Sequence, residues 1–178
     1  MENAHKGTTN GSKPPGRLRR AWNRLMVNSC LDLPDAEAVP RVRELGQGSV
    51  PCLVDKIAKG GPDSAKAAHL IGRLAEWRHN DCISAIGPLE ELLKKGDILE
   101  AQNAAMALLA IRTEESVMGA LRGYVQGSQT SRKCVVSAFK ANGNEWVRIY
   151  LEAIAEDCGD ANVKVAAQRI LSELKGGH

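Results

Sequence analysis

Apolar and polar positions follow one another along this chain in a pattern that recurs four times. Each copy has an apolar strip that ends in Leu, then a polar break, then a second strip rich in Ala. The first strips are marked by Leu53, Leu89, Leu121 and Leu151, so successive copies lie 36, 32 and 30 residues apart. A repeat of this length predicts a stack of helix pairs.

Turn and capping residues separate the predicted helices. Ser49 can cap a helix that has Pro51 in its first turn and ends at Gly60–Gly61, and Asp63 or Ser64 begins the next helix. The later breaks fall at Gly96–Asp97, Gly127–Ser128, Gly143–Asn144 and Gly159–Asp160.

A further helix is predicted before the repeats, between Pro34 and Gly46. Asp35 is a candidate N-cap for it. Because Pro40 interrupts the pattern, the alternative is a start as late as Val39.

The second helix of each predicted pair carries small residues at matching positions. Counted from Ala67, Ala104, Cys134 and Ala166, these positions are 37, 30 and 32 residues apart. Small side chains let two helix backbones approach closely, so successive second helices are predicted to pack against one another. The full set is Ala67 and Ala68, Ala104 and Ala105, Cys134 with Ser137 and Ala138, and Ala166 and Ala167.

Two of the copies resemble the HEAT repeat, especially the short bacterial form that is also found in phycobilisome-lyase-type proteins. The first copy joins Val50-Pro51-Cys52-Leu53 to Ala67-Ala68-His69-Leu70-Ile71-Gly72-Arg73-Leu74, and the second joins Ile86-Gly87-Pro88-Leu89 to Ala104-Ala105-Met106-Ala107-Leu108-Leu109. The third and fourth copies lack the proline of the first helix, and Phe139-Lys140-Ala141 replaces the Leu-Gly step in the third. The turn Asp and second-helix Arg of the family survive in part, as Asp160 with Lys164 and as Arg132 or Lys133. Armadillo-type arrays share such Ala/Leu repeats.

The resemblance implies an all-α protein, a short right-handed α-solenoid of about four to five HEAT-like helix pairs. We divide the chain into a disordered basic arm at 1–16, N-terminal capping helices at 17–48 and the repeat array at 49–178. Residues 17–175 are expected to form a single domain. In HEAT-like arrays the second helices line the concave face.

Composition agrees with a helical domain that has its own core. Hydrophobic residues make up 43% of 178 residues and aromatic residues only 3%, so Leu, Ile, Val and Ala must fill the core. No apolar run reaches the roughly 20 residues needed to cross a bilayer. The N-terminus has Gly, Thr, Asn and Pro where a signal peptide has an apolar stretch. These features predict a cytoplasmic protein without a membrane span.

The positive charge is concentrated at the N-terminus. Residues 1–24 hold six Lys and Arg against Glu2 alone, a net of +5, whereas the whole chain has +3 and the remainder therefore −2. Within this segment Leu18, Trp22, Leu25 and Met26 recur at helical spacing. The basic positions of this helix are Arg17, Arg19, Arg20 and Arg24.

A basic amphipathic helix of this kind can contact an anionic membrane or nucleic acid. We favour a different interpretation, in which Trp22 and its apolar neighbours cover the open end of the array and the arginines are solvated, because terminal repeats need a polar outer face. Trp77 and Trp146 also lie near predicted helix ends, where the rings are expected to fill gaps between layers.

We find no sequence signature of catalysis, metal binding or a cofactor. Nucleotide-binding, zinc-hydrolase and serine-hydrolase motifs are missing from the sequence. His69, His79, Asp81 and Cys82 lack the ordered spacing of zinc ligands. Glu90 is expected to be solvated and to pair with Lys94. The five cysteines, Cys30, Cys52, Cys82, Cys134 and Cys158, are predicted to act as small apolar residues.

The remaining candidate site is the polar part of the predicted concave face. From this face we predict a non-enzymatic scaffold or adaptor that binds another protein, with an acidic segment of that protein as the candidate ligand. The alternative is nucleic-acid binding, in which these Lys and Arg and the basic arm contact phosphates. A third hypothesis, a chromophore-lyase-like subunit, follows from the family resemblance only. The candidate residues are Lys66, His69, Arg73, Gln102, Met106, Lys133, Ser137, Lys140, Lys164 and Gln168.

Overall fold

All regular elements in the described part of the chain are helical. The computed structural model describes residues 16–142 and 145–176, and no strand occurs in them. Of the predicted arm, 1–16, only Gly16 belongs to this part, and the predicted break at Gly143–Asn144 lies outside it. The helices are α1 (Gly16–Leu31), α2 (Asp35–Leu45), α3 (Val50–Lys59), α4 (Ser64–Arg78), α5 (Ile86–Lys95), α6 (Ile98–Ile111), α7 (Glu114–Gln126), α8 (Gln129–Ala141), α9 (Glu145–Asp157) and α10 (Ala161–Lys175), with the short 3₁₀ turns η1 (Gly46–Gly48) and η2 (His79–Ala85).

Local capping chemistry sets the helix ends. Asp97 accepts hydrogen bonds from the N–H groups of Leu99 and Glu100, and Glu100 accepts one from the N–H of Asp97, which completes a capping box. Gly60 ends α3 with a φ of 67°, a conformation that favours glycine. These ends agree with the predicted breaks.

Two predicted starts are corrected in detail. The helix α2 begins at Asp35 and continues through Pro40, so a start at Val39 is wrong, and Pro34 instead of Asp35 occupies the N-cap position. Ser49 does precede α3, but its Oγ donates to the carbonyl of Gly46 at 2.7 Å and does not cap the helix. In the first case Pro34 holds the N-cap position, and in the second the side chain of Ser49 bonds to the turn before the helix.

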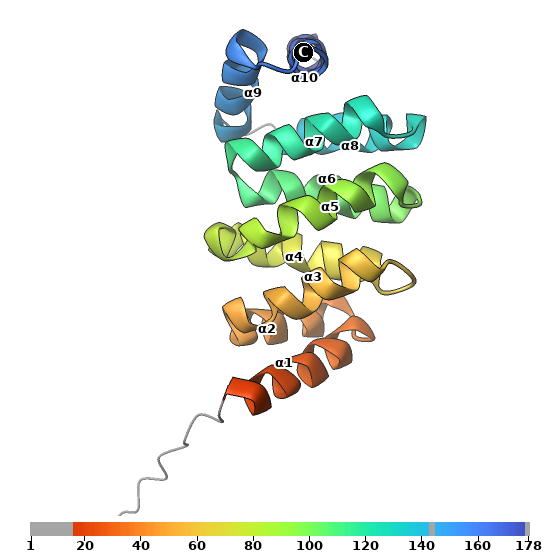
Figure 1. Cartoon of the computed structure of the whole chain (residues 1–178), viewed down its shortest axis with the longest axis vertical. Helices are drawn as coiled ribbons and strands as arrows, with labels where there is room; N and C mark the ends of the chain where they lie inside the picture. Colours follow the sequence, from red (N-terminus) through yellow and green to blue (C-terminus); the bar gives the residue numbers. More distant parts are fainter. Residues whose placement is uncertain (1–15, 143–144, 177–178) are drawn as a thin grey trace, which may run out of the picture.

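The helices are arranged as pairs that follow one another along the long axis of the molecule (Figure 1). The first helices of the pairs contact in series, α1 to α3 to α5 to α7, and the second helices do the same, α2 to α4 to α6 to α8. The last pair departs from this order, because α9 runs along the long axis and α10 packs mainly on α9 and α7. In the part of the chain that the structure describes, no helix has the length and apolar composition of a membrane-crossing segment.

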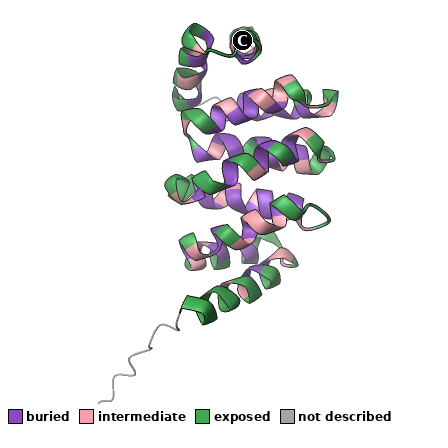
Figure 2. Cartoon of the chain, in the orientation of Figure 1, coloured by how far each residue is buried: buried purple, intermediate pink, exposed green. Residues whose placement is uncertain are grey.

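The closest packing is between the second helices α4 and α6. Ala67, Ala68, Ala104 and Ala105 are fully buried there, and buried residues follow the lines where helices meet (Figure 2). A Cβ added to Gly72 would lie 3.3 Å from the Cα of Ala107, which shows that the two backbones approach closely. The predicted packing of small residues is therefore confirmed for these helices.

The predicted end cap at α1 is wrong in its orientation. Leu18, Trp22 and Leu25 are 60%, 56% and 63% exposed, and α1 is almost wholly exposed in Figure 2. The helix instead buries Val27 and Cys30, on its opposite face, and Asn23 donates from its amide to the carbonyl of Gly48 at 3.1 Å. The apolar stripe therefore points away from the body.

The tryptophans do not fill gaps between layers. Trp77 and Trp146 are 66% and 58% exposed, and Trp22 is exposed as well. The guanidinium of Arg43 lies 3.8 Å from the ring centroid of Trp77, a cation–π contact on the surface. The core is filled by aliphatic side chains and Phe139, as the composition indicates.

Glu90 is buried, with 8% exposure, and is not solvated as predicted. It pairs with Lys94 at 2.6 Å as predicted, and it also accepts two hydrogen bonds from Arg122 of α7, at 2.8 and 3.0 Å. Burial acts to raise the pKa of Glu90, but the hydrogen bonds from Arg122 and Lys94 outweigh it, so the pKa lies below its ordinary value. The cluster ties α5 to α7.

Replacing Gly72 by Val should destabilise the fold. The valine side chain would separate the backbones of α4 and α6, at a cost of about 1–3 kcal/mol. Urea unfolding followed by circular dichroism measures this loss. The matched control is Gly87→Ala, where an added Cβ meets no atom within 4 Å, and which should be neutral or slightly stabilising. Equal stability of Gly72→Val and wild type would contradict the close packing of the two helices.

Replacing Glu90 by Gln should lower the free energy of unfolding at pH 7 by about 1.5–3 kcal/mol, because Arg122 and Lys94 lose a buried carboxylate. The pKa of Glu90 is lower in the folded state than in the unfolded chain. The stabilisation is therefore present above the unfolded pKa of about 4.5 and disappears as the pH falls through the folded pKa. Unfolding curves at pH 7 and at about pH 3 should show a larger difference between wild type and variant at pH 7. Glu91→Gln is the control: Glu91 is exposed and pairs with Lys95 and, at a longer 3.3 Å, with Lys94, so its replacement should have a smaller effect than Glu90→Gln.

Candidate partner-binding surface

Two hollows on the second helices meet at His69 and Arg73. One, of about 440 Å³, lies between α2 and α4, and the other, of about 390 Å³, lies between α4, α6 and the end of α8. Together they form a continuous depression that we call the inner groove. It is lined by Asp35, Ala36, Val39, Pro40, Arg43, His69, Gly72, Arg73, Glu76, Gln102, Asn103, Met106, Leu109, Ala110, Arg112 and Asn142.

Hydrogen bonds within the fold hold the side chains of the inner groove in place. Arg73 Nη1 lies 2.6 Å from Glu76 Oε1, and Asn103 donates to the carbonyl of Ala65 at 2.9 Å. The amide of Asn142 donates to the sulfur of Met106 at 3.3 Å. The groove thus offers a fixed polar rim and an adaptable apolar contact at Met106.

A second depression, of about 540 Å³, lies between α8 and α10, and we call it the basic groove. It contains the predicted residues Lys133, Ser137 and Lys140. Arg169 pairs with Glu173 at 3.7 Å, and Arg132 donates to the carbonyl of Tyr124 at 3.1 Å. Within residues 16–142 and 145–176, neither Lys133 nor Lys140 forms an ion pair. The lining residues are Tyr124, Gln129, Arg132, Lys133, Val136, Ser137, Lys140, Arg169 and Glu173.

Three predicted contact residues are occupied by contacts within the fold. Lys66 forms an ion pair with Asp35, Lys164 donates to the carbonyl of Glu156 at 2.6 Å, and Gln168 donates to the carbonyl of Ala155 at 3.1 Å. The turned position of α9 and α10 explains the last two. Of the ten predicted residues, the inner groove holds His69, Arg73, Gln102 and Met106, and the basic groove holds Lys133, Ser137 and Lys140.

Asp35 organises the first end of the inner groove. Its carboxylate binds Lys66 and lies 3.0 Å from His69 Nε2. The hydrogen bond from Lys66 lowers the pKa of Asp35 most, and the charges of His69 and Arg73 lower it further. The Nε2 atom of His69 is buried and has no well-directed hydrogen bond among the described residues. Asp160, which occupies the position of the family's turn Asp, caps α10 by accepting hydrogen bonds from the N–H groups of Asn162 and Val163.

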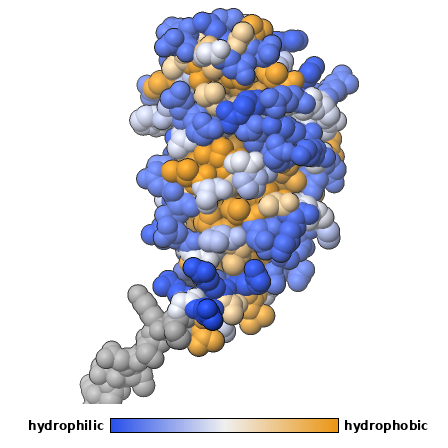
Figure 3. All heavy atoms as spheres, in the orientation of Figure 1, coloured by the Kyte–Doolittle hydropathy of each residue, from blue (hydrophilic) through white to orange (hydrophobic). Residues whose placement is uncertain are grey.

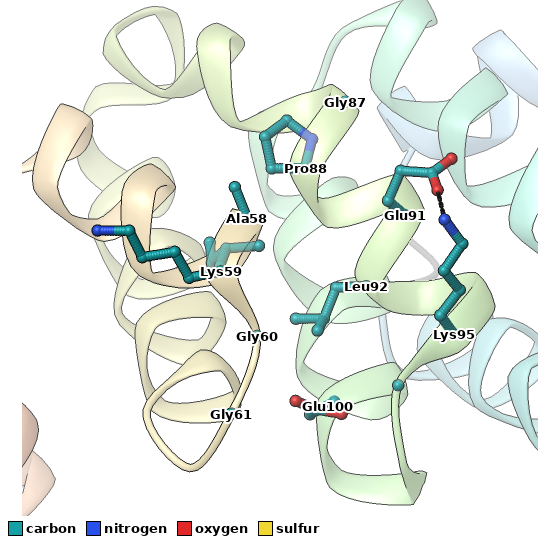
Figure 4. Close-up of a pocket in the computed structure, with 12 residues that line it drawn as sticks. Ala58, Lys59, Gly60, Gly61, Gly87, Pro88, Glu91, Leu92, Lys95 and Glu100 are labelled. Carbon is teal, nitrogen blue, oxygen red and sulfur yellow. Dashed lines mark ion pairs between the residues drawn. The ribbon is translucent and has the colours of Figure 1, made fainter.

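Sequence reasoning missed a hollow of about 540 Å³ on the side of the first helices, between α3 and α5 (Figure 4). Ile57, Pro88 and Leu92 give it apolar walls, and Gly60 and Gly61 leave it open. Its charged side chains are already paired: Lys59 with Asp55, Glu91 with Lys95, and Glu100 with Ser64. Gly87, in the first turn of α5, lines this hollow, and a Cβ added there would meet no atom within 4 Å.

The structure assembles no catalytic or metal centre from the candidate cluster. Cys82 is buried and its thiol points to the carbonyl of Ile71 at 3.9 Å, Asp81 lies 3.3 Å from Arg78, and His69 binds Asp35. No three His, Cys, Asp or Glu side chains converge as metal ligands in the described ranges. The binding surfaces therefore remain the strongest candidates.

Comparisons of the chain with protein-family models, with curated proteins and with solved structures found no match. The function must therefore be inferred from the geometry and charge of the chain itself. The inner groove and the basic groove are the surfaces on which such an inference can rest.

The cysteines should react with Ellman's reagent in two classes. Burial raises the pKa of Cys82 to about 12 and also raises the pKa of Cys30 and Cys134, so these thiols should be unreactive in the folded protein. Burial raises the pKa of Cys52 too, but Cys52 and Cys158 are only half-buried, so the reagent can reach them and they should react slowly. In denaturing urea all five should react. The double variant Cys52→Ser and Cys158→Ser is the control, and rapid reaction of that folded variant would contradict the burial of the other three.

Proposed function

We propose that this chain is a HEAT-like, right-handed α-solenoid that binds a segment of another protein along its second helices and has no enzymatic role. The serial contacts of the first helices and of the second helices support the repeat arrangement. The buried small residues of α4 and α6, at the positions where the HEAT pattern has them, support it as well. Such arrays use an extended surface for binding.

One observation carries the choice of ligand: Lys133 and Lys140 have no ion pair among the described residues, while most neighbouring charges are paired. They lie seven positions apart on α8, about 10 Å by helix rise. Val136 lies between them in the same groove, beside Tyr124. An extended acidic segment can place carboxylates on the two lysines and an apolar side chain on Val136.

The inner groove lies on the earlier second helices, nearer α2, and reaches α8 at Asn142. Met106 is 37% exposed and is accompanied by Leu109 and Ala110, which give apolar contact. Gln102 and Arg112 add polar donors at the rim. A peptide that continues from the basic groove would therefore meet a less charged and more apolar surface. A partner segment with acidic residues at one end and apolar residues at the other fits this order.

Nucleic acid is the second candidate, because Arg132, Lys133, Lys140 and Arg169 are the groups that bind phosphate. The basic groove is short, and Arg169 is already paired with Glu173. Phosphate binding would depend steeply on salt, whereas a mixed acidic and apolar peptide would be less sensitive. This difference separates the two candidates.

The test is selection of peptides on immobilised wild-type protein, followed by fluorescence-polarisation titration of the enriched sequences. The proposal predicts enriched peptides that contain Asp or Glu and an apolar residue. The double variant Lys133→Glu and Lys140→Glu should weaken them by at least about tenfold, which corresponds to 1.4 kcal/mol.

The matched control is Lys59→Glu with Lys95→Glu. These changes alter the net charge equally but lie at the hollow between α3 and α5, and they should leave binding within about twofold. Titration of a short DNA duplex at several salt concentrations completes the design. If no peptide is enriched and the duplex binds with a steep salt slope that the groove variant removes, the partner is nucleic acid and the peptide proposal fails.

A further inference from the structure

The helix α1 exposes an apolar stripe that the fold does not use. Leu18, Trp22 and Leu25 are all more than half exposed, and their spacing places them on one face. Val27 and Cys30, on the other face, make the contact with the body and are fully buried. The stripe lies at the end of the stack, where apolar and strongly hydrophilic atoms occur side by side (Figure 3). An exposed apolar stripe rimmed by charge marks an interaction surface.

The stripe has a strongly basic border. The helix α1 contains Arg17, Arg19, Arg20 and Arg24 and no acidic residue, a net charge of +4. Among the described residues its one ion pair is between Arg24 and Asp55, at a long 3.9 Å. A partner for this surface must therefore combine apolar and acidic groups.

The chain itself carries such a surface on α9. Trp146 and Ile149 are 58% and 46% exposed, and Ala153 is exposed on the same face. The helix has Glu145, Glu152, Glu156 and Asp157 against Arg148 alone, a net charge of −3. This surface belongs to the last pair of helices, at the opposite end of the molecule from α1 (Figure 1).

The charges have the same register on both helices. Arg17 and Arg24 each precede an end of the α1 stripe, Leu18 and Leu25, by one position. Glu145 and Glu152 precede Trp146 and Ala153, the ends of the α9 stripe, in the same way. Each charged edge therefore lies on the same side of its stripe, and each stripe is seven positions long, about 10 Å. When two such helices pack face to face and run antiparallel, the arginine edge of α1 lies beside the glutamate edge of α9.

We infer that α1 of one copy packs antiparallel on α9 of a second copy, with Arg17 beside Glu152 and Arg24 beside Glu145. This goes beyond the proposed peptide binding and does not depend on it. Because each copy carries both surfaces, the contact is heterologous and joins copies into chains or rings. Two short stripes bury little area, so the association is weak and depends on salt.

An anionic membrane surface accounts for the observations less well. It would bind the apolar and basic stripe of α1. The acidic border of α9 would be repelled by the same lipids, and its exposed Trp146 and Ile149 would remain without a ligand. A second copy uses both surfaces at once.

Sedimentation velocity of the full chain at concentrations from about 10 µM to about 1 mM, which covers weak contacts of this size, tests the inference. The weight-average mass should rise with concentration and should fall toward the monomer when salt is raised. A monomeric mass over the whole range overturns the proposal.

Charge reversal identifies the two surfaces. The variant Arg17→Glu with Arg24→Glu and the variant Glu145→Arg with Glu152→Arg should each stay monomeric. All four changes in one chain restore opposite charges and should restore association. Arg17, Arg24 and Glu145 are exposed, and Glu152 is half-buried and lies 3.6 Å from Arg148. Circular dichroism verifies that each variant remains folded. Lys95→Glu, which alters an exposed pair on α5 and touches neither helix, should associate like wild type.

Two results would overturn the assignment. Association that persists in the Glu145→Arg and Glu152→Arg variant shows that α9 is not the partner surface. Failure of the fourfold variant to associate shows that the paired edges do not meet. Flotation with vesicles of anionic lipid is the last arm: a wild type that binds vesicles through Trp22 and stays monomeric in solution assigns α1 to membranes and sinks the second-copy proposal.

Discussion

The rest of the structure depends on how closely α4 and α6 approach one another. A pair of helices of ten to fifteen residues cannot bury two faces by itself, so each pair has to be covered by its neighbours. At the centre the backbones of the two helices come close together, because Gly72, Ala67 and Ala104 have no side chain larger than a methyl group. Close contact of this kind maximises dispersion and leaves no space for water. It also fixes the distance between successive helix pairs, and therefore the spacing of the side chains exposed on their surface.

Polar contacts between the layers follow the same period as the sequence. Ser64 binds Glu100 across 36 residues, Met106 accepts from Asn142 across 36 residues, and Glu90 binds Arg122 across 32 residues. Each contact satisfies a group that is partly or wholly buried at a junction, where leaving it without a partner would be costly. The charges that remain without such a contact are therefore informative. Among the described residues, Lys133 and Lys140 stand out on the second helices for this reason, and Arg17, Arg19 and Arg20 of α1 and Glu145, Glu156 and Asp157 of α9 do so at the ends, whereas Arg24 pairs with Asp55 and Glu152 with Arg148.

Sequence could predict what depends on neighbouring residues and could not predict what depends on the orientation of whole helices. The breaks at Gly60–Gly61 and Gly96–Asp97 are local, and both were predicted. The close packing of small residues between α4 and α6 was predicted too, because residues at matching positions of successive repeats lie next to one another in a stack. The stripe at Leu18 and Trp22 was correctly identified as apolar, but periodicity does not say which face meets the body, and α1 uses Val27 and Cys30. Gln168 was lost from the candidate surface because α10 is turned relative to the earlier pairs.

The two ends of the molecule have helix faces that no further layer covers. A stack of helix pairs covers every inner face with the next layer, and its terminal helices have no further layer on one side. A polar outer face is the usual solution. Here Trp22 and Trp146 remain exposed at opposite ends, Trp22 on a helix with a net charge of +4 and Trp146 on a helix with a net charge of −3. Contact between copies would cover both rings with the kind of helix-on-helix packing that joins successive pairs within the chain. It would also place the grooves of successive copies in one assembly, so that a surface with room for a short peptide would be repeated along it.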